Sequence, residues 1–212
     1  MYDNFFLSDG IMSVEVTFVL MFPLLRRLEK LDVMFGTEKG APEYVAGLAR
    51  AMPALRELRV DFDFSVDDEW SLKPIVDLIQ GAAKSLRLVY LNTCEGYPDT
   101  LNACLSKCVN LERVQASGDE APTLAAMRCL KKLKHFEQLY LYPSKRDVDG
   151  FAACLQKVET LCSELPELQF INLRIYHCSF GASKAPLIKL CQQSAAAVKR
   201  RRPGVEVRFN PA

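Results

Sequence analysis

A short phrase of apolar residues recurs along the chain and constrains its fold more than any other feature. Its clearest copy runs from Leu86 to Cys94 and is apolar at its first, fourth and sixth positions. Six copies share these positions: Leu28, Leu31 and Val33; Leu55, Leu58 and Val60; Leu86, Val89 and Leu91; Leu111, Val114 and Ala116; Phe136, Leu139 and Leu141; and Leu168, Ile171 and Leu173. Successive copies start 27, 31, 25, 25 and 32 residues apart. Self-similarity at such a period indicates a repeat architecture.

The intervals between the copies read mostly as helices, because apolar residues recur in them at helical spacing. The last helix is expected over residues 184–202, before the helix-ending pair Pro203-Gly204. The alternating residues 205–209 predict a closing strand. Strands that alternate with helices favour a parallel sheet, and a repeated phrase requires each unit to occupy the same environment, as in a solenoid. The sequence therefore predicts an α/β solenoid whose three apolar positions point inward.

Composition restricts the compartment and the class of partner. The chain has 27 lysines and arginines against 26 aspartates and glutamates, which disfavours nucleic acid as a partner. The apolar run from Val16 to Leu25 is too short to span a bilayer, so we expect no membrane segment. The start, Met1 to Asn4, lacks the basic residues of a secretory leader. The eight cysteines are therefore expected to be reduced, buried thiols in a cytoplasmic or nuclear protein.

Residues 108–114, Cys-Val-Asn-Leu-Glu-Arg-Val, resemble the C-x-N-L-E-x-L phrase of ribonuclease-inhibitor-like leucine-rich-repeat proteins, in the cysteine-bearing variety found in F-box proteins. The resemblance implies a right-handed horseshoe with a parallel sheet on the concave face and helices on the convex face. It departs from the pattern at the ninth position, where only Cys94 matches, and no F-box-like segment is visible. We expect a single domain over 1–212, in which 25–209 hold about six or seven repeats and 1–24 form an irregular cap or a truncated repeat.

No pattern in the sequence indicates a reaction. His177 and Cys178 are adjacent, but adjacency does not place a base beside a nucleophile. Cys104 and Cys108 lie one helical turn apart, yet zinc would need two further ligands at matching spacing. Glycine motifs that cradle phosphate are missing. We therefore expect no catalytic residue, no metal, no cofactor and no enzymatic activity.

The basic cluster at residues 199–202 has two interpretations. It could serve as a nuclear-import or nucleic-acid patch. The preferred interpretation is a cationic last turn of a helix, which the helix dipole stabilises. Lys131, Lys132 and Lys134 are interpreted in the same way.

The outward positions of the strands carry the candidate binding residues. Positions three, five and seven of each copy alternate with the inward apolar positions. Several of them are aromatic residues or arginines, the types enriched at binding hot spots. Tyrosine also favours strands for structural reasons, so packing stays an open alternative. The candidate partner-binding residues are Arg59, Tyr90, Arg113, Tyr140, Tyr142, Phe170 and Arg174.

These residues predict a non-catalytic module that recognises another protein at the concave face. The resemblance implies the substrate-binding part of an F-box-like ubiquitin-ligase adaptor. Two alternatives stay open: a ligand-sensing repeat domain of an immune-receptor-type protein, and an α/β enzyme with a Cys/His site. A pocket holding His135 or His177 beside a thiol would favour the enzyme. The sequence leaves the oligomeric state open.

Overall fold

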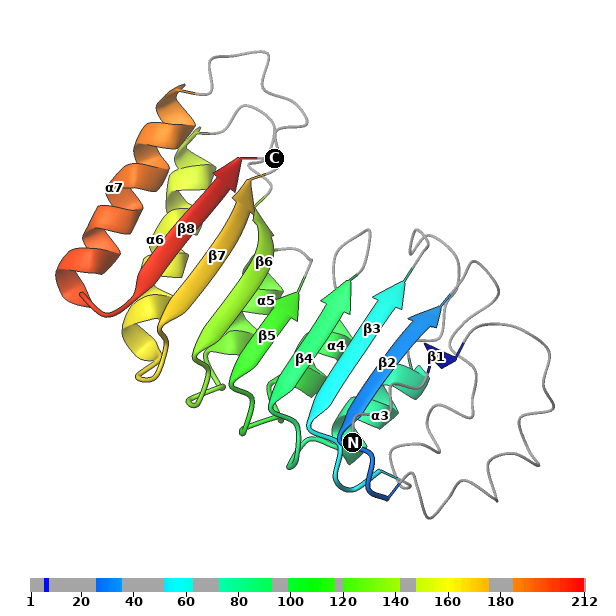
Figure 1. The fold of residues 1–212 in the computed structure, drawn as a ribbon. Helices are drawn as coiled ribbons and strands as arrows, with labels where there is room; N and C mark the ends of the chain where they lie inside the picture. The colour runs from blue at the N-terminus through cyan, green and yellow to red at the C-terminus, as the bar shows by residue number, and fades with distance from the viewer. Residues whose placement is uncertain are drawn as a thin grey trace.

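The computed structural model describes residues 6–7, 26–35, 52–62, 73–92, 99–116, 120–141, 148–175 and 185–211. The strands of these residues form one eight-stranded sheet, in which every strand pairs in parallel with its neighbours in sequence order (Figure 1). The expected α/β architecture with a parallel sheet is confirmed. The expected N-terminal cap lies outside the described residues, apart from Phe6 and Leu7.

The described elements alternate along the chain as the sequence predicts. The strands are β1 (Phe6–Leu7), β2 (Lys30–Phe35), β3 (Glu57–Phe62), β4 (Leu88–Asn92), β5 (Arg113–Ala116), β6 (His135–Leu141), β7 (Phe170–Ile175) and β8 (Glu206–Pro211). The helices are α3 (Lys73–Gly81), α4 (Asp99–Leu105), α5 (Glu120–Met127), α6 (Val148–Glu164) and α7 (Ala185–Arg201). These helices follow one another along one face of the sheet, and no described helix covers the other face (Figure 1). The last helix and the closing strand lie where the sequence places them.

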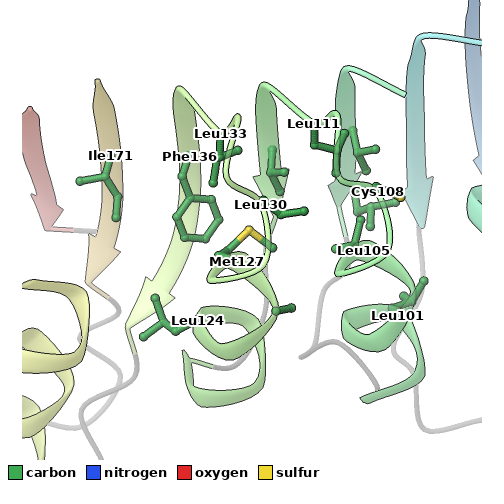
Figure 2. Close-up of a cluster of buried hydrophobic side chains, with 14 of the residues drawn as sticks. Leu101, Leu105, Cys108, Leu111, Leu124, Met127, Leu130, Leu133, Phe136 and Ile171 are labelled. Atoms are coloured by element: carbon green, nitrogen blue, oxygen red, sulfur yellow. The ribbon is translucent and has the colours of Figure 1, made fainter. Parts of the chain in front are cut away.

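The core lies between the sheet and the row of helices. Figure 2 shows Phe136 of β6 directed toward Met127 and Leu124 of α5, with Leu101 and Leu105 of α4 in the neighbouring unit. These side chains are between 0% and 4% exposed. Full burial of one such side chain stabilises the fold by roughly 1.5–3 kcal/mol, so this layer supplies most of the free energy that holds the units together.

A similar turn precedes each strand from β3 to β8. In five units the backbone amide of the first apolar residue donates to the carbonyl three residues earlier, whereas Leu86 donates to the Ala82 carbonyl, four residues earlier, at 3.0 Å. The bonds are Leu55 to Met52 at 3.1 Å, Leu111 to Cys108 at 2.9 Å, Leu133 to Leu130 at 2.9 Å, Leu168 to Leu165 at 3.3 Å and Val205 to Arg202 at 3.0 Å. The accepting residue is itself buried at Met52, Cys108, Leu130 and Leu165. At these four places the turn therefore folds over a buried apolar side chain, and we call the turn before each strand the corner.

Each corner also joins its unit to the preceding one. Two consecutive amides share a single carbonyl of the neighbouring unit: Arg56 and Glu57 donate to Glu29, Arg87 and Leu88 to Arg56, Glu112 and Arg113 to Arg87, Lys134 and His135 to Glu112, and Gln169 and Phe170 to Lys134. The nitrogen–oxygen distances lie between 2.8 and 3.0 Å. This pattern fixes the register of every strand before the strand begins.

The sequence-based register of β6 is wrong by three residues. The structure pairs Val114 with Phe136, so the fifth unit starts at Leu133 rather than at Phe136. Leu133 is completely buried and closes the corner with Leu130. A register shift between Glu137 and Leu139 then brings Leu139 opposite Leu173. Because the bulge adds one residue to the strand, Phe136, Leu139 and Leu141 happen to have the spacing of the repeated phrase.

The basic cluster at residues 199–202 has a structural role at its end. The guanidinium of Arg202 donates to the carbonyls of Cys162 at 3.1 Å, Leu165 at 2.9 Å and Pro166 at 2.9 Å. These carbonyls belong to the last turn of α6 and the corner after it, where helical carbonyls lack intrahelical donors. Arg201 lies 3.5 Å from Glu159 of α6. The cationic end of α7 therefore fastens α7 to α6.

Replacing Phe136 by alanine should lower the free energy of unfolding by about 3–5 kcal/mol, because it removes a fully buried ring from the core. Urea denaturation measures the change. Glu137→Gln, the adjacent substitution on the other face of the sheet, should cost less than about 0.5 kcal/mol. A cost below about 1 kcal/mol for Phe136→Ala would contradict the packing described here.

Arg202→Lys should lower the free energy of unfolding by about 1–3 kcal/mol, since one ammonium cannot satisfy carbonyls that a planar guanidinium spans. Thermal and urea denaturation of the full chain measure the loss. Arg200→Lys, on an exposed side chain in the last turn of α7, is the matched control and should be neutral. Equal stability of the two variants would show that Arg202 does not fasten α6.

Candidate functional site

Alternate side chains of the strands point away from the helices and form the face of the sheet that no described helix covers. One row across the strands contains Lys30, Glu57, Leu88, Arg113, His135, Phe170 and Glu206. The next row contains Asp32, Arg59, Tyr90, Gln115, Glu137, Asn172 and Arg208. All of these side chains are half-buried or exposed. We call these two rows, with Asp61, Arg174 and Asn210 beyond them, the open face.

Arg59 is the centre of the contacts in the first half of the open face. Its Nε lies 2.9 Å from Asp61 Oδ2 and 3.8 Å from Asp32 Oδ2. Its guanidinium carbon lies 4.3 Å from the centre of the Tyr90 ring, which is a cation–π arrangement. Partial burial raises the pKa of Tyr90, and the nearby Asp61 carboxylate adds to the rise. The Tyr90 hydroxyl therefore stays protonated at neutral pH and presents a neutral polar tip.

A partly open depression of about 300 Å³ lies on the open face over β2 to β5. Arg59, Tyr90 and Arg113 line it together with Leu88 and Gln115. Leu88 contributes an apolar floor, and the two arginines and the tyrosine contribute polar tips. This combination suits one side chain of a protein partner.

A second arginine–aromatic contact occupies the other end of the open face. The guanidinium carbon of Arg208 lies 5.2 Å from the centre of the Phe170 ring. The His135 ring centre lies 6.1 Å from that of Phe170, with the two planes tilted by 46°. Asn210 Nδ2 donates to Asn172 Oδ1 at 2.8 Å. Neighbouring strands thus hold one another's side chains in place across the face.

Ion pairs on the open face orient side chains more than they stabilise the fold. Lys30 Nζ lies 2.6 Å from Glu57 Oε2, and Arg113 Nε lies 3.9 Å from Glu137 Oε1. Exposed pairs of this kind contribute about 0–1 kcal/mol each. The described face carries five cations, Lys30, Arg59, Arg113, Arg174 and Arg208, and five carboxylates, Asp32, Glu57, Asp61, Glu137 and Glu206. Its charge is therefore mixed and close to balanced.

The structure brings together only part of the candidate set. Arg59, Tyr90 and Arg113 line one depression, while Phe170 lies at the other end of the face beside Arg208. In the structure, the Tyr140 backbone pairs with that of Arg174, which lies beyond the two rows defined above. The sequence-based register placed Tyr140 in the second of those rows instead. The Tyr140 side chain and all of Tyr142 lie outside the described part of the structure.

Sequence reasoning missed His135, Glu137 and Arg208 as members of the open face. His135 and Glu137 were missed because of the register error in β6. The sequence-based register placed Gln138 opposite Arg113 on the open face, whereas in the structure His135 pairs with Arg113. The signal that could have found them is the corner, because Leu130-x-x-Leu133 matches Cys108-x-x-Leu111. Arg208 was overlooked because its strand was interpreted only as the end of the sheet.

The described thiols lie away from His135. Cys104, Cys108, Cys154, Cys162 and Cys191 are buried on the helix side of the sheet, whereas Cys129 is exposed, contrary to the expectation of burial. Burial raises the pKa of Cys104, Cys108, Cys162 and Cys191 to about 12. His177, Cys178 and Cys94 lie outside the described residues. The four thiols with a raised pKa are thus protonated at neutral pH and lie on the helix side of the sheet, whereas the His135 imidazole lies on the open face.

No three histidine, cysteine, aspartate or glutamate side chains among the described residues gather closely enough to hold a metal ion. None of the described helices combines the length and apolar character that crossing a membrane requires.

Comparisons with known proteins add little. No family model and no curated protein matches the chain. Lysine decarboxylase from Selenomonas ruminantium is similar at 13% identity and a TM-score of 0.32, over 99% of this chain and 66% of that chain. Arginine decarboxylase of Paramecium bursaria Chlorella virus is similar at 9% identity and a TM-score of 0.32, over 94% of this chain and 61% of that chain. The chain spans less than two thirds of these proteins, and TM-scores this low support neither a fold nor an activity.

Iodoacetamide should modify Cys129 of the native protein much faster than Cys104, Cys108, Cys162 and Cys191. A pKa of about 12 in place of 9.0 lowers the thiolate fraction at pH 8 by about a thousandfold, and burial blocks access as well. Site-resolved mass spectrometry measures the rates, and labelling in denaturant, where the sites should react alike, is the control. Equal native rates at Cys104 and Cys129 would contradict the described packing.

Proposed function

We propose that the chain is a run of about six or seven leucine-rich repeats in a right-handed solenoid, and that it recognises another protein without catalysing a reaction. The fold proposal is supported by the sequence-ordered parallel sheet with one row of helices. It is also supported by the corner, in which the first apolar residue donates to the carbonyl three residues earlier in five described units, four of them with a buried apolar residue as the acceptor. A repeat array accounts for both, because each unit packs only against its neighbours.

The observation that carries the recognition proposal is the pair of arginine–aromatic contacts on the open face. Tyr90 under Arg59 and Phe170 beside Arg208 are partly exposed. Aromatic residues and arginine dominate the binding energy of protein interfaces. Strands hold these side chains with little freedom left to lose, so a partner that binds them incurs a small entropic cost.

Charge on the open face restricts the kind of protein that would bind. Five cations and five carboxylates alternate over the described strands. Such a face complements a partner of mixed charge, whose own ion pairs set its orientation. The depression beside Tyr90 would take one apolar or aromatic side chain of that partner.

The finer proposal is the substrate-binding part of an F-box-like ubiquitin-ligase adaptor in the cytoplasm or nucleus. The resemblance of residues 108–114 supports the family, and the free thiols of the described cysteines suit a reducing compartment. An F-box in the parent protein would support this proposal. A nucleotide-binding domain in the parent protein would instead favour the immune-receptor alternative.

The test compares the partners of two double variants with those of the unaltered chain. Tyr90→Ala with Arg113→Ala alters the open face, and Lys157→Ala with Ile188→Ala removes one cation and one apolar side chain from exposed positions of α6 and α7. Quantitative affinity purification identifies the partner, and titration with that partner gives the affinity. The open-face variant should bind at least about 30-fold more weakly, which corresponds to a hot-spot loss of about 2 kcal/mol.

Circular dichroism and thermal denaturation should show both double variants folded. Unchanged binding by the open-face variant, together with weakened binding by the helix-face variant, would move the recognition surface to the helices and refute the proposal.

A further inference from the structure

The connections between helices and strands are far more basic than the chain as a whole. In the described connections that lead into β2 to β8, residues 26–29, 52–56, 82–87, 106–112, 128–134, 165–169 and 202–205, we count 11 cations and 3 acids. The cations are Arg26, Arg27, Arg56, Lys84, Arg87, Lys107, Arg128, Lys131, Lys132, Lys134 and Arg202, and the acids are Glu29, Glu112 and Glu167. The whole chain has 27 against 26. We call these connections the corner edge.

The corner edge is a continuous ridge along one end of the sheet, where the strands begin (Figure 1). Amide–carbonyl bonds place Arg56, Arg87, Glu112 and Lys134 side by side on successive strands. Neighbouring strands lie about 4.8 Å apart, so charges of successive connections act on the same ligand. The Asn110 side chain links its own connection to the two neighbouring ones. It donates to the Lys84 carbonyl and accepts from the Lys132 ammonium, each at 2.8 Å.

The fold itself does not use all of these cations. Arg202 satisfies carbonyls after α6, and Arg128 pairs with Glu164 at 3.0 Å. Lys84 and Lys107, by contrast, are exposed and form no side-chain hydrogen bond or ion pair within the described residues. Their charges are available to a ligand.

Helix dipoles explain little of the surplus. The dipole acts mainly within the last turn of a helix. The last turns of α3, α4, α5 and α6 contain no basic residue, and only α7 ends on basic residues, at Lys199, Arg200 and Arg201. The cations of the other units lie after the helix, in the corner, where side chains project to solvent.

The structure shows how the corner edge holds a carboxylate. Glu112 Oε1 lies 3.0 Å from Arg87 Nη1 of the preceding connection, and Glu112 Oε2 lies 2.9 Å from Lys134 Nζ of the following one. One carboxylate is therefore bound between cations of two neighbouring connections. Lys84 and Lys107 have no such carboxylate partner within the described residues.

We propose that the corner edge binds an extended acidic segment of a partner protein, through the aspartates and glutamates of that segment. The ridge fits a linear ligand, and the Glu112 contact is the geometry each bound carboxylate would adopt. The described connections contain no phenylalanine, tyrosine or tryptophan, so they offer no stacking platform for single-stranded nucleic acid. The near-neutral chain also lacks the broad positive field that attracts duplexes. The corner edge lies beside the open face and acts independently of it.

The test measures binding of dye-labelled poly-L-glutamate to the full chain by fluorescence anisotropy at low ionic strength. Lys84→Glu with Lys107→Glu reverses two unpaired cations of the corner edge. Lys157→Glu with Lys189→Glu makes the same change in net charge on exposed positions of α6 and α7. Poly-L-glutamate should bind the unaltered chain and the helix-face variant with equal affinity, and the corner-edge variant about tenfold more weakly. Salt should weaken the binding, since exposed charges are screened.

Three results would overturn the proposal. One is the absence of binding to poly-L-glutamate at low ionic strength. Another is an equal loss in both double variants, which would reduce the effect to net charge. The third is tighter binding of a duplex DNA or of phosphatidylserine vesicles than of poly-L-glutamate, which would assign the edge to phosphate ligands.

Discussion

The shared carbonyl at each corner is the interaction on which the rest of the structure depends. Two consecutive amides of one unit bond to a single carbonyl of the unit before it, for example Arg87 and Leu88 to Arg56. A slip by one residue would break both bonds and would turn every apolar side chain of the strand toward solvent. Because each unit takes its register from its predecessor, the corners decide which side chains reach the core and which reach the open face.

This constraint separates the residues that stabilise the molecule from those of the open face, where we propose that a partner binds. The inward side chains of β3 to β7 whose burial the structure describes are at most 1% exposed: Leu58, Val60, Val89, Leu91, Val114, Phe136, Ile171 and Leu173. The open face holds exposed ion pairs that contribute about 0–1 kcal/mol each. The two sets alternate along the same strands, so side chains on the open face can change without disturbing the core. If the proposed repeat array is correct, its outward side chains can diversify while the scaffold stays constant.

The error in β6 shows where sequence reasoning fails. Residues 136–141 match the apolar phrase as well as the true unit does, since Phe136, Leu139 and Leu141 occupy its three positions. The bulge after Glu137 inserts a residue that no pattern of fixed spacing can accommodate. In this unit the corner is a better guide than the strand, because Leu133 bonds to the Leu130 carbonyl at the same three-residue spacing as Leu111 to Cys108. The exposure of Cys129 was not predicted for a similar reason. Apolar neighbours in the sequence do not determine on which side of a turn a side chain lies.

The sequence alone determined the alternation of strands and helices, the parallel sheet and the inward positions of most units, because those depend on periodicity within a segment. It also provided most of the candidate binding residues, since outward positions follow from inward ones. Only the tertiary structure decided that Arg59 lies over Tyr90, that Arg208 lies beside Phe170 and that Arg202 caps α6. These contacts join residues of different units. Their geometry comes from the register between strands, which the backbone bonds at the corners set and which no local pattern records.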